Sequence, residues 1–101
     1  MQRVTVLYPN AADTKFDFDD YLNERVPWVA RLVGQSIELR RGLSSLDGAR
    51  APFVCVATIF VDTVEVFQTI FAKHAKEIVA DIPNYTNSQP ILQIDEVVRS
   101  A

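Results

Sequence analysis

The spacing of hydrophobic residues along the chain predicts six secondary-structure elements. Four short apolar runs of strand type lie at 4–8, 36–43, 53–61 and 91–98, and two segments with helical spacing lie at 17–34 and at 62 to about 80. The run at 53–61 is continuously apolar, which is typical of a central strand covered on both faces. The run at 36–43 alternates and has one polar face, as an edge strand does.

The two helices begin with different capping signals. Asp17 is the expected N-cap of the first helix, with Asp20 at the third position, and Pro27 predicts a kink or a break into two short helices. The second helix is expected to begin at Asp62, with Glu65 completing a capping box. The residues that complete these patterns are the apolar stripe Phe18, Leu22, Val29 and Leu32 before Gly34, and the hydrophobic staple Val61 and Val66.

The order strand, helix, strand, strand, helix, strand predicts a ferredoxin-like α+β fold over a single domain, residues 1–101. In this βαββαβ arrangement both helices cover one face of a four-stranded antiparallel sheet. Alternate residues of a strand point to opposite faces of the sheet, and the strands at 4–8 and 53–61 have apolar residues on both faces. The face that the helices leave uncovered therefore needs a partner. Such a face measures roughly 300 to 400 Å², which is comparable with the largest patch that a monomer exposes. We therefore expect a homodimer through the open sheet face.

Composition and charge limit the partners and the compartment. The chain has 101 residues, of which 49% are hydrophobic, and a net charge of −3, so we expect neither nucleic acid nor a membrane surface as partner. No stretch is long enough to span a membrane, and the start of the chain has no signal-peptide pattern. The lone Cys55 lies in an apolar run and is expected to be a small buried residue. We expect a cytoplasmic protein.

Two polar residues stand on apolar helical stripes. His74 shares a face with Phe71 and Ile78, where an imidazole acts as a proton-transfer group or is satisfied within the core. Arg25 shares a face with Phe18 and Val29; it either reaches solvent along the stripe or pairs with an acid such as Asp81.

Other side chains suggest a pocket without a metal or a nucleotide. Tyr8, Tyr21, Trp28 and Tyr85 combine aromatic surface with a polar group, and the polar segment 81–90 contains two prolines that hold it rigid, as expected at a pocket mouth. A single histidine and a single cysteine are too few for the usual protein-only zinc or iron site, and the sequence has no nucleotide-binding motif. We expect no metal and no cofactor.

The segment 71–86, FAKHAKEIVADIPNYT, followed by Gln89-Pro90-Ile91, resembles the EthD family, named for ethyl tert-butyl ether degradation. The start VTVLYP at 4–9 and the segment Tyr21-Leu22-Asn23 with Pro27 beyond it are also similar to that family. The resemblance implies a dimeric α+β barrel, with small monooxygenases, muconolactone isomerases and polyketide cyclases as relatives. Arg25 departs from the pattern, because many relatives have a histidine at that position.

The resemblance also implies an association with oxidative degradation of small organic compounds. It carries over His74 as the catalytic residue and the loop residues Asp81, Asn84, Tyr85 and Thr86. One hypothesis is a cofactor-independent, oxidoreductase-like or isomerase-like enzyme in which His74 moves a proton on a hydrophobic metabolite. The other is a non-catalytic accessory protein that binds a hydrophobic ligand and supports a partner oxygenase. The candidate ligand-binding residues are Tyr8, Arg25, Trp28, Phe71, Asp81, Asn84, Tyr85 and Thr86.

Overall fold

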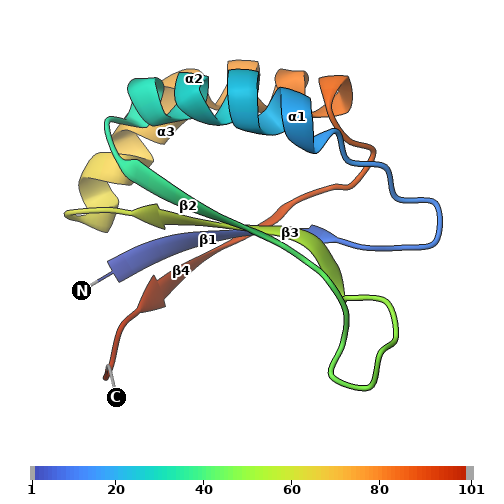
Figure 1. The fold of residues 1–101 in the computed structure, drawn as a ribbon. Coiled ribbons are helices and arrows are strands. Elements are labelled where there is room, and N and C mark those ends of the chain that lie inside the picture. Colours follow the sequence, from blue (N-terminus) through green and yellow to red (C-terminus); the bar gives the residue numbers. More distant parts are fainter. Residues whose placement is uncertain (1, 100–101) are drawn as a thin grey trace.

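The computed structural model describes residues 2–99 and places helices on one face of a four-stranded antiparallel sheet (Figure 1). The sheet has the order β2-β3-β1-β4, so β1 and β3 are central. This confirms the ferredoxin-like βαββαβ fold predicted from the sequence. The strands are β1 (Gln2–Pro9), β2 (Ser36–Arg41), β3 (Phe53–Phe60) and β4 (Ile91–Glu96); the helical elements are α1 (Phe18–Asp20), the π turn η1 (Tyr21–Arg25), α2 (Val26–Val33), α3 (Val64–Asp81) and the 3-10 turn η2 (Ile82–Asn84).

The first helical segment passes through its proline without a break. Asp17 caps it as expected, because its Oδ1 accepts a hydrogen bond from the Asp20 amide at 3.1 Å. Pro27 supplies no N–H, and the chain widens into η1, where the Val26 amide donates to the Tyr21 carbonyl, five residues back. The helix then continues to Gly34, whose φ of 65° ends it.

The wider turn changes which residues of this segment face the sheet. Tyr21 is buried, whereas Leu22 is 46% exposed, although the sequence spacing placed Leu22 on the apolar stripe. A π turn contains one extra residue, which rotates the side chains after it about the helix axis. Counting the buried positions with an uninterrupted α-helical period therefore selects Leu22 in place of its neighbour Tyr21. The expectation for Leu22 is therefore wrong.

Helix α3 begins one residue later than the capping pattern predicted. The cap is Thr63, in extended conformation, whose Oγ1 accepts from the Val66 amide at 3.3 Å, and Asp62 lies outside the helix. Val66 is 49% exposed and makes no staple with the buried Val61. A threonine caps as Asp does, so two adjacent candidates could not be ranked from the sequence.

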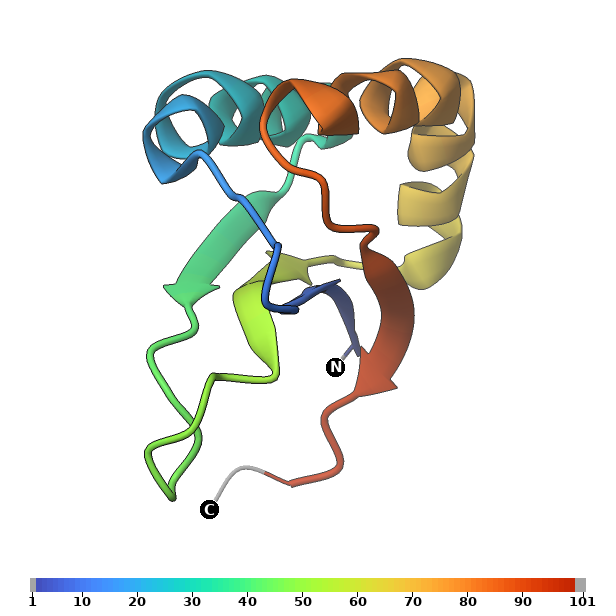
Figure 2. The ribbon, with the colours of Figure 1, turned by 90° about the vertical axis from the view of Figure 1, so that its right-hand side faces the viewer.

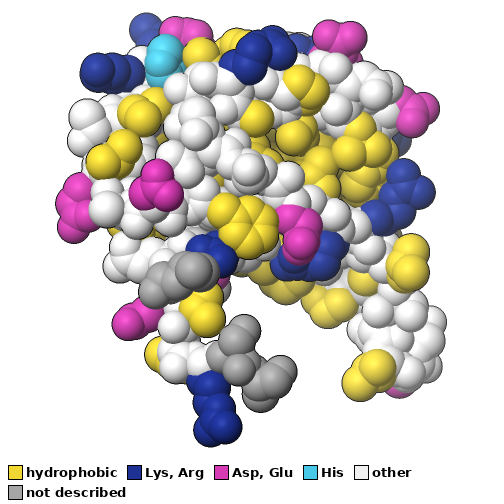
Figure 3. Space-filling model, turned by 60° about the vertical axis from the view of Figure 1, so that its left-hand side comes forward, with side chains coloured by type: hydrophobic (Ala, Val, Ile, Leu, Met, Phe, Trp, Pro, Cys, Tyr) yellow, Lys and Arg dark blue, Asp and Glu magenta, His cyan; other side chains and the backbone are white. Residues whose placement is uncertain are grey.

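Two apolar clusters lie between the helical layer and the sheet, the two layers seen in Figure 2. One joins both central strands to α2 and α3; the other joins β1 and β3 to η1 and η2. In the space-filling view of Figure 3, apolar side chains gather below the charged side chains at the top of the molecule. Cys55, in the second cluster, is fully buried, as expected. None of the helices within residues 2–99 has the length and apolarity needed to cross a membrane. The clusters consist of Val4, Val33, Ile59, Val61, Val64 and Phe67, and of Tyr8, Tyr21, Cys55, Ile82 and Tyr85.

The sheet face opposite the helices carries both apolar and polar side chains. Leu7 pairs across the sheet with Val56 and Ile91, and the Arg3 guanidinium lies over the Phe60 ring at 4.4 Å. A pair of threonines lies between these two contacts on the central strands, and the edge strands add polar and charged residues. The loop 42–52 and residues 97–99 project on the same side (Figures 1 and 2). The homodimer through this face stays a prediction.

A charge placed at the centre of this face tests the homodimer. Val56→Lys should convert a dimer into a monomer at micromolar concentration, because a buried ammonium without a partner is costly. Val66→Lys, on the exposed side of α3, is the matched control and should leave the dimer intact. Sedimentation measures both. A wild-type protein that sediments as a monomer contradicts the prediction.

Candidate functional site

An apolar cavity of about 220 Å³ lies between the helical layer and the sheet. Its walls come from the two central strands, from α2, α3 and η2, and from the segment that leads into β4. No charged side chain lines it, and its polar groups are the two tyrosines and one glutamine. The lining residues are Val6, Tyr8, Val29, Val33, Ile59, Phe67, Phe71, Ile78, Val79, Ile82, Tyr85, Gln89, Pro90 and Leu92.

The segment that carries Tyr85 is tied to the loop that follows β1. The Asp17 amide donates to the Tyr85 carbonyl at 2.8 Å. The buried hydroxyls of Thr86 and Ser88 donate to the Lys15 and Pro9 carbonyls at 2.6 and 2.7 Å. These bonds satisfy backbone groups that burial would otherwise leave unpaired, and they fix where Tyr85 stands. The rigidity predicted for 81–90 thus has a structural cause.

The three tyrosines of the chain meet at one end of the cavity. The Tyr8 hydroxyl lies 2.9 Å from the Tyr85 hydroxyl and 3.5 Å from the Tyr21 hydroxyl. Tyr8 also contacts both rings edge to face, with centroids 6.2 and 5.9 Å apart. Phe16 packs edge to face on Tyr8 at 5.1 Å. Edge-to-face packing is the preferred arrangement of aromatic rings, so this cluster holds its hydroxyls in fixed positions.

Burial keeps these phenols and the neighbouring thiol neutral. Desolvation raises the pKa of Tyr8, Tyr21 and Tyr85 well above the ordinary value of 10.0. Desolvation also raises the pKa of the Cys55 thiol to about 11. The phenols can therefore donate hydrogen bonds at neutral pH, whereas the thiol is a poor nucleophile.

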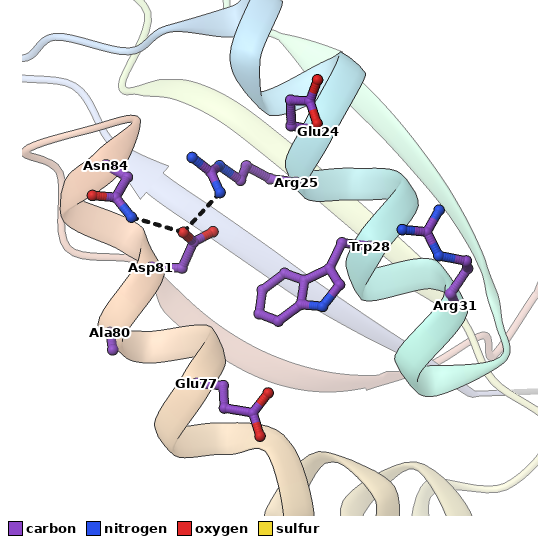
Figure 4. A pocket seen from close by; sticks show the side chains of 8 residues that line it. All are labelled: Glu24, Arg25, Trp28, Arg31, Glu77, Ala80, Asp81 and Asn84. Carbon is purple, nitrogen blue, oxygen red and sulfur yellow. Dashed lines mark hydrogen bonds and ion pairs between the residues drawn. The ribbon is translucent and has the colours of Figure 1, made fainter.

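A second, polar groove of about 500 Å³ lies on the outer surface between the helices (Figure 4). Arg25 crosses it, with Nη1 2.9 Å from Asp81 Oδ1 and Nε 2.9 Å from Asp20 Oδ2. Asn84 donates to the same Asp81 oxygen at 2.9 Å. The Trp28 indole lies beside this network. Arg25 is thus the partner of an acid, one of the two alternatives that the sequence allowed.

His74 lines neither of these spaces. Its side chain is 30% exposed, and its Nδ1 is buried without a hydrogen-bond partner in residues 2–99. The nearest carboxylate oxygen, Glu77 Oε1, is 3.9 Å away, too far for a hydrogen bond. Phe71 and Ile78, one helical turn to either side, do line the cavity. Catalysis by His74 stays a prediction.

The structure divides the predicted ligand-binding residues between the two spaces. Tyr8, Phe71 and Tyr85 line the cavity, whereas Thr86 lines neither space and ties two segments together. The wall residues that the sequence did not single out carry no chemical signal, because they resemble any other core positions. Within residues 2–99 no group of three or more His, Cys, Asp or Glu side chains lies close enough to hold a metal ion. The other four predicted residues, Arg25, Trp28, Asp81 and Asn84, line the outer groove.

Alkaline titration tests the burial of the tyrosine cluster. Because folding raises the pKa of these phenols, the folded state binds more protons than the unfolded state above pH 10. As pH rises from 9, the raised pKa of the Cys55 thiol should cause a small decline in the free energy of unfolding. The phenols should have no effect on this free energy below pH 10 and should lower it as pH rises further. The phenolate absorbance should appear together with the loss of circular dichroism. Tyrosines that titrate near pH 10 in a folded protein would contradict the cluster.

Comparisons with solved structures identify relatives of the whole chain. An EthD-like protein of Ralstonia eutropha JMP134 is 34% identical, with a TM-score of 0.91 over 99% of this chain and 94% of that one. An EthD family protein of Bacillus halodurans C-125 is 20% identical, with a TM-score of 0.68 over 95% of this chain and 97% of that one. HapK of Hahella chejuensis is 14% identical, with a TM-score of 0.55 over 100% and 97%, and shares the fold alone.

Comparisons with models of known families and with curated proteins find no match. The solved structures therefore carry the assignment. The Ralstonia relative shares both the fold and a third of its residues, over nearly the full length of both chains. The chain belongs to the EthD-like family.

Proposed function

We propose that this protein binds a small hydrophobic molecule in the cavity between α3 and the sheet. The observation that carries the proposal is the cavity itself, which has about 220 Å³ of space and no charged lining residue. An apolar cavity of about 150 Å³ accepts benzene. The volume here suits a slightly larger molecule, such as a substituted ring or a branched chain, and is below the roughly 300 Å³ at which drug-sized sites begin.

The kinship supports a role in the degradation of small organic compounds. The Bacillus halodurans relative belongs to the ethyl tert-butyl ether (EthD) family, and such ethers are small, branched and uncharged. A molecule of this kind gains free energy by leaving water for an apolar cavity. As a binding protein, the chain would hold such a metabolite for a partner oxygenase.

A proton-transfer enzyme is the second candidate, and it depends on His74. A buried ring nitrogen without a hydrogen-bond partner is costly, and such groups are often kept for function. Because His74 lies one turn from two wall residues, a shift of its side chain would bring the imidazole toward a bound molecule. A neutral imidazole there could accept a proton without a cofactor.

Blocking the cavity tests ligand binding. Val79 lines the cavity and is 58% exposed, so Val79→Trp should occupy part of the cavity without straining the core. Ethylbenzene, followed by NMR titration, should bind to the wild-type protein and lose at least roughly tenfold in affinity in the variant, because the wall position is occupied. Val66→Trp, on the same helix but outside the cavity, should bind normally. Equal binding by all three proteins would place the probe elsewhere.

Replacing His74 separates the enzyme from the binding protein. His74→Ala should leave ethylbenzene binding unchanged, since the imidazole lines no part of the cavity, and should abolish turnover of a metabolite that co-purifies with the protein. Mass spectrometry measures the turnover. Lys73→Ala, one residue earlier on the exposed side of α3, is the control. Turnover that survives in His74→Ala removes the catalytic role and leaves ligand binding.

A further inference from the structure

The hydroxyls of the tyrosine cluster contain one more donor than the cluster uses. Tyr21, Tyr8 and Tyr85 form a chain with two oxygen–oxygen contacts, of 3.5 and 2.9 Å. Each hydroxyl has one hydrogen to donate, so two contacts can use two of the three hydrogens. Within residues 2–99 these hydroxyls make no other hydrogen bond. One phenolic hydrogen is left for a group that the protein itself does not supply.

Two of the three hydroxyls belong to residues that line the cavity, Tyr8 and Tyr85, whereas Tyr21 does not line it. Either oxygen of each contact can be the donor, so the place of the spare hydrogen depends on the order of the bonds. A ligand acceptor beside Tyr85 selects the order in which Tyr21 donates to Tyr8 and Tyr8 donates to Tyr85, because that order leaves the hydrogen of Tyr85 free. Hydrogen bonds in such a chain polarise one another, so the terminal donor is strengthened. Gln89 also lines the cavity, but it is an exposed residue, unlike the buried Tyr85.

The charges near this end disfavour an anion. No cationic side chain lines the cavity to balance one, and the buried phenols stay neutral. Asp81 acts on Tyr85 as a negative charge, and its ion-pair partner Arg25 lines the outer groove and not the cavity. A carboxylate that entered the cavity would lose its hydration without gaining a counter-charge.

We infer that the molecule bound in this cavity is uncharged and largely apolar and carries one acceptor oxygen, a carbonyl or an ether, that accepts the hydrogen bond of Tyr85. This inference rests on the proposed function and adds the chemical class of the ligand. The apolar walls hold the hydrocarbon part, and the hydroxyl chain fixes which end of the molecule points inward.

Three probes of similar size test the class: acetophenone, ethylbenzene and benzoate. In NMR titrations acetophenone should bind roughly tenfold more tightly than ethylbenzene, because it satisfies a buried donor, and benzoate should not bind. Tyr85→Phe should bring acetophenone down to the affinity of ethylbenzene. Tyr21→Phe, which removes a hydroxyl outside the cavity, is the matched control and should keep the preference.

A vibrational measurement keeps the test decisive if Tyr85→Phe does not fold. The carbonyl stretch of acetophenone bound to the wild-type protein should shift to lower frequency than in an alkane, as it does on accepting a hydrogen bond. Equal binding of acetophenone and ethylbenzene, or tighter binding of benzoate, overturns the ligand class and leaves a hydrophobic site. Failure of all three probes to bind overturns the proposed function itself.

Discussion

Tyr8 joins the sheet to both ends of the helical layer. It stands on central strand β1, it contacts Tyr21 of η1 and Tyr85 beyond η2, and its hydroxyl bridges theirs. Because the helices cover only one face of the sheet, these contacts set the distance between the helical layer and the sheet beside the tyrosine cluster. Tyr8 and Tyr85 also form part of the cavity wall, together with aliphatic residues and two phenylalanines of α3. The polar end of the candidate site is therefore part of the structural core.

The outer groove serves a different purpose from the cavity in this arrangement. Arg25 links the first helical segment to the end of α3 through Asp81, and Asp20 completes its ion pairs. These side chains are partly exposed, so each pair contributes little stability by itself. Because one guanidinium contacts two carboxylates from different segments, it instead orients the end of α3, from which η2 and Tyr85 follow. Arg25 thus supports the site from outside.

The sequence predicted the elements because their periodicity is local. The alternation in the strands, the Asp17 cap and the burial of Cys55 all depend on neighbours within a few residues. The start of α3 was misplaced by one residue, since Asp62 and Thr63 are both good caps and the choice depends on how the chain leaves β3. The exposure of Leu22 was missed because the π turn before Pro27 shifts the face.

The sequence by itself determined the fold class, the family resemblance and the set of polar side chains from which a site could be built. Only the tertiary structure decided which of them meet. Tyr8, Tyr21 and Tyr85 are far apart in the chain, and their hydroxyls come together because β1, η1 and η2 converge. Arg25 and Trp28 share the first helical segment with wall residue Val29 but face outward. Helical faces and strand neighbours are set by packing between distant segments, which sequence spacing does not record.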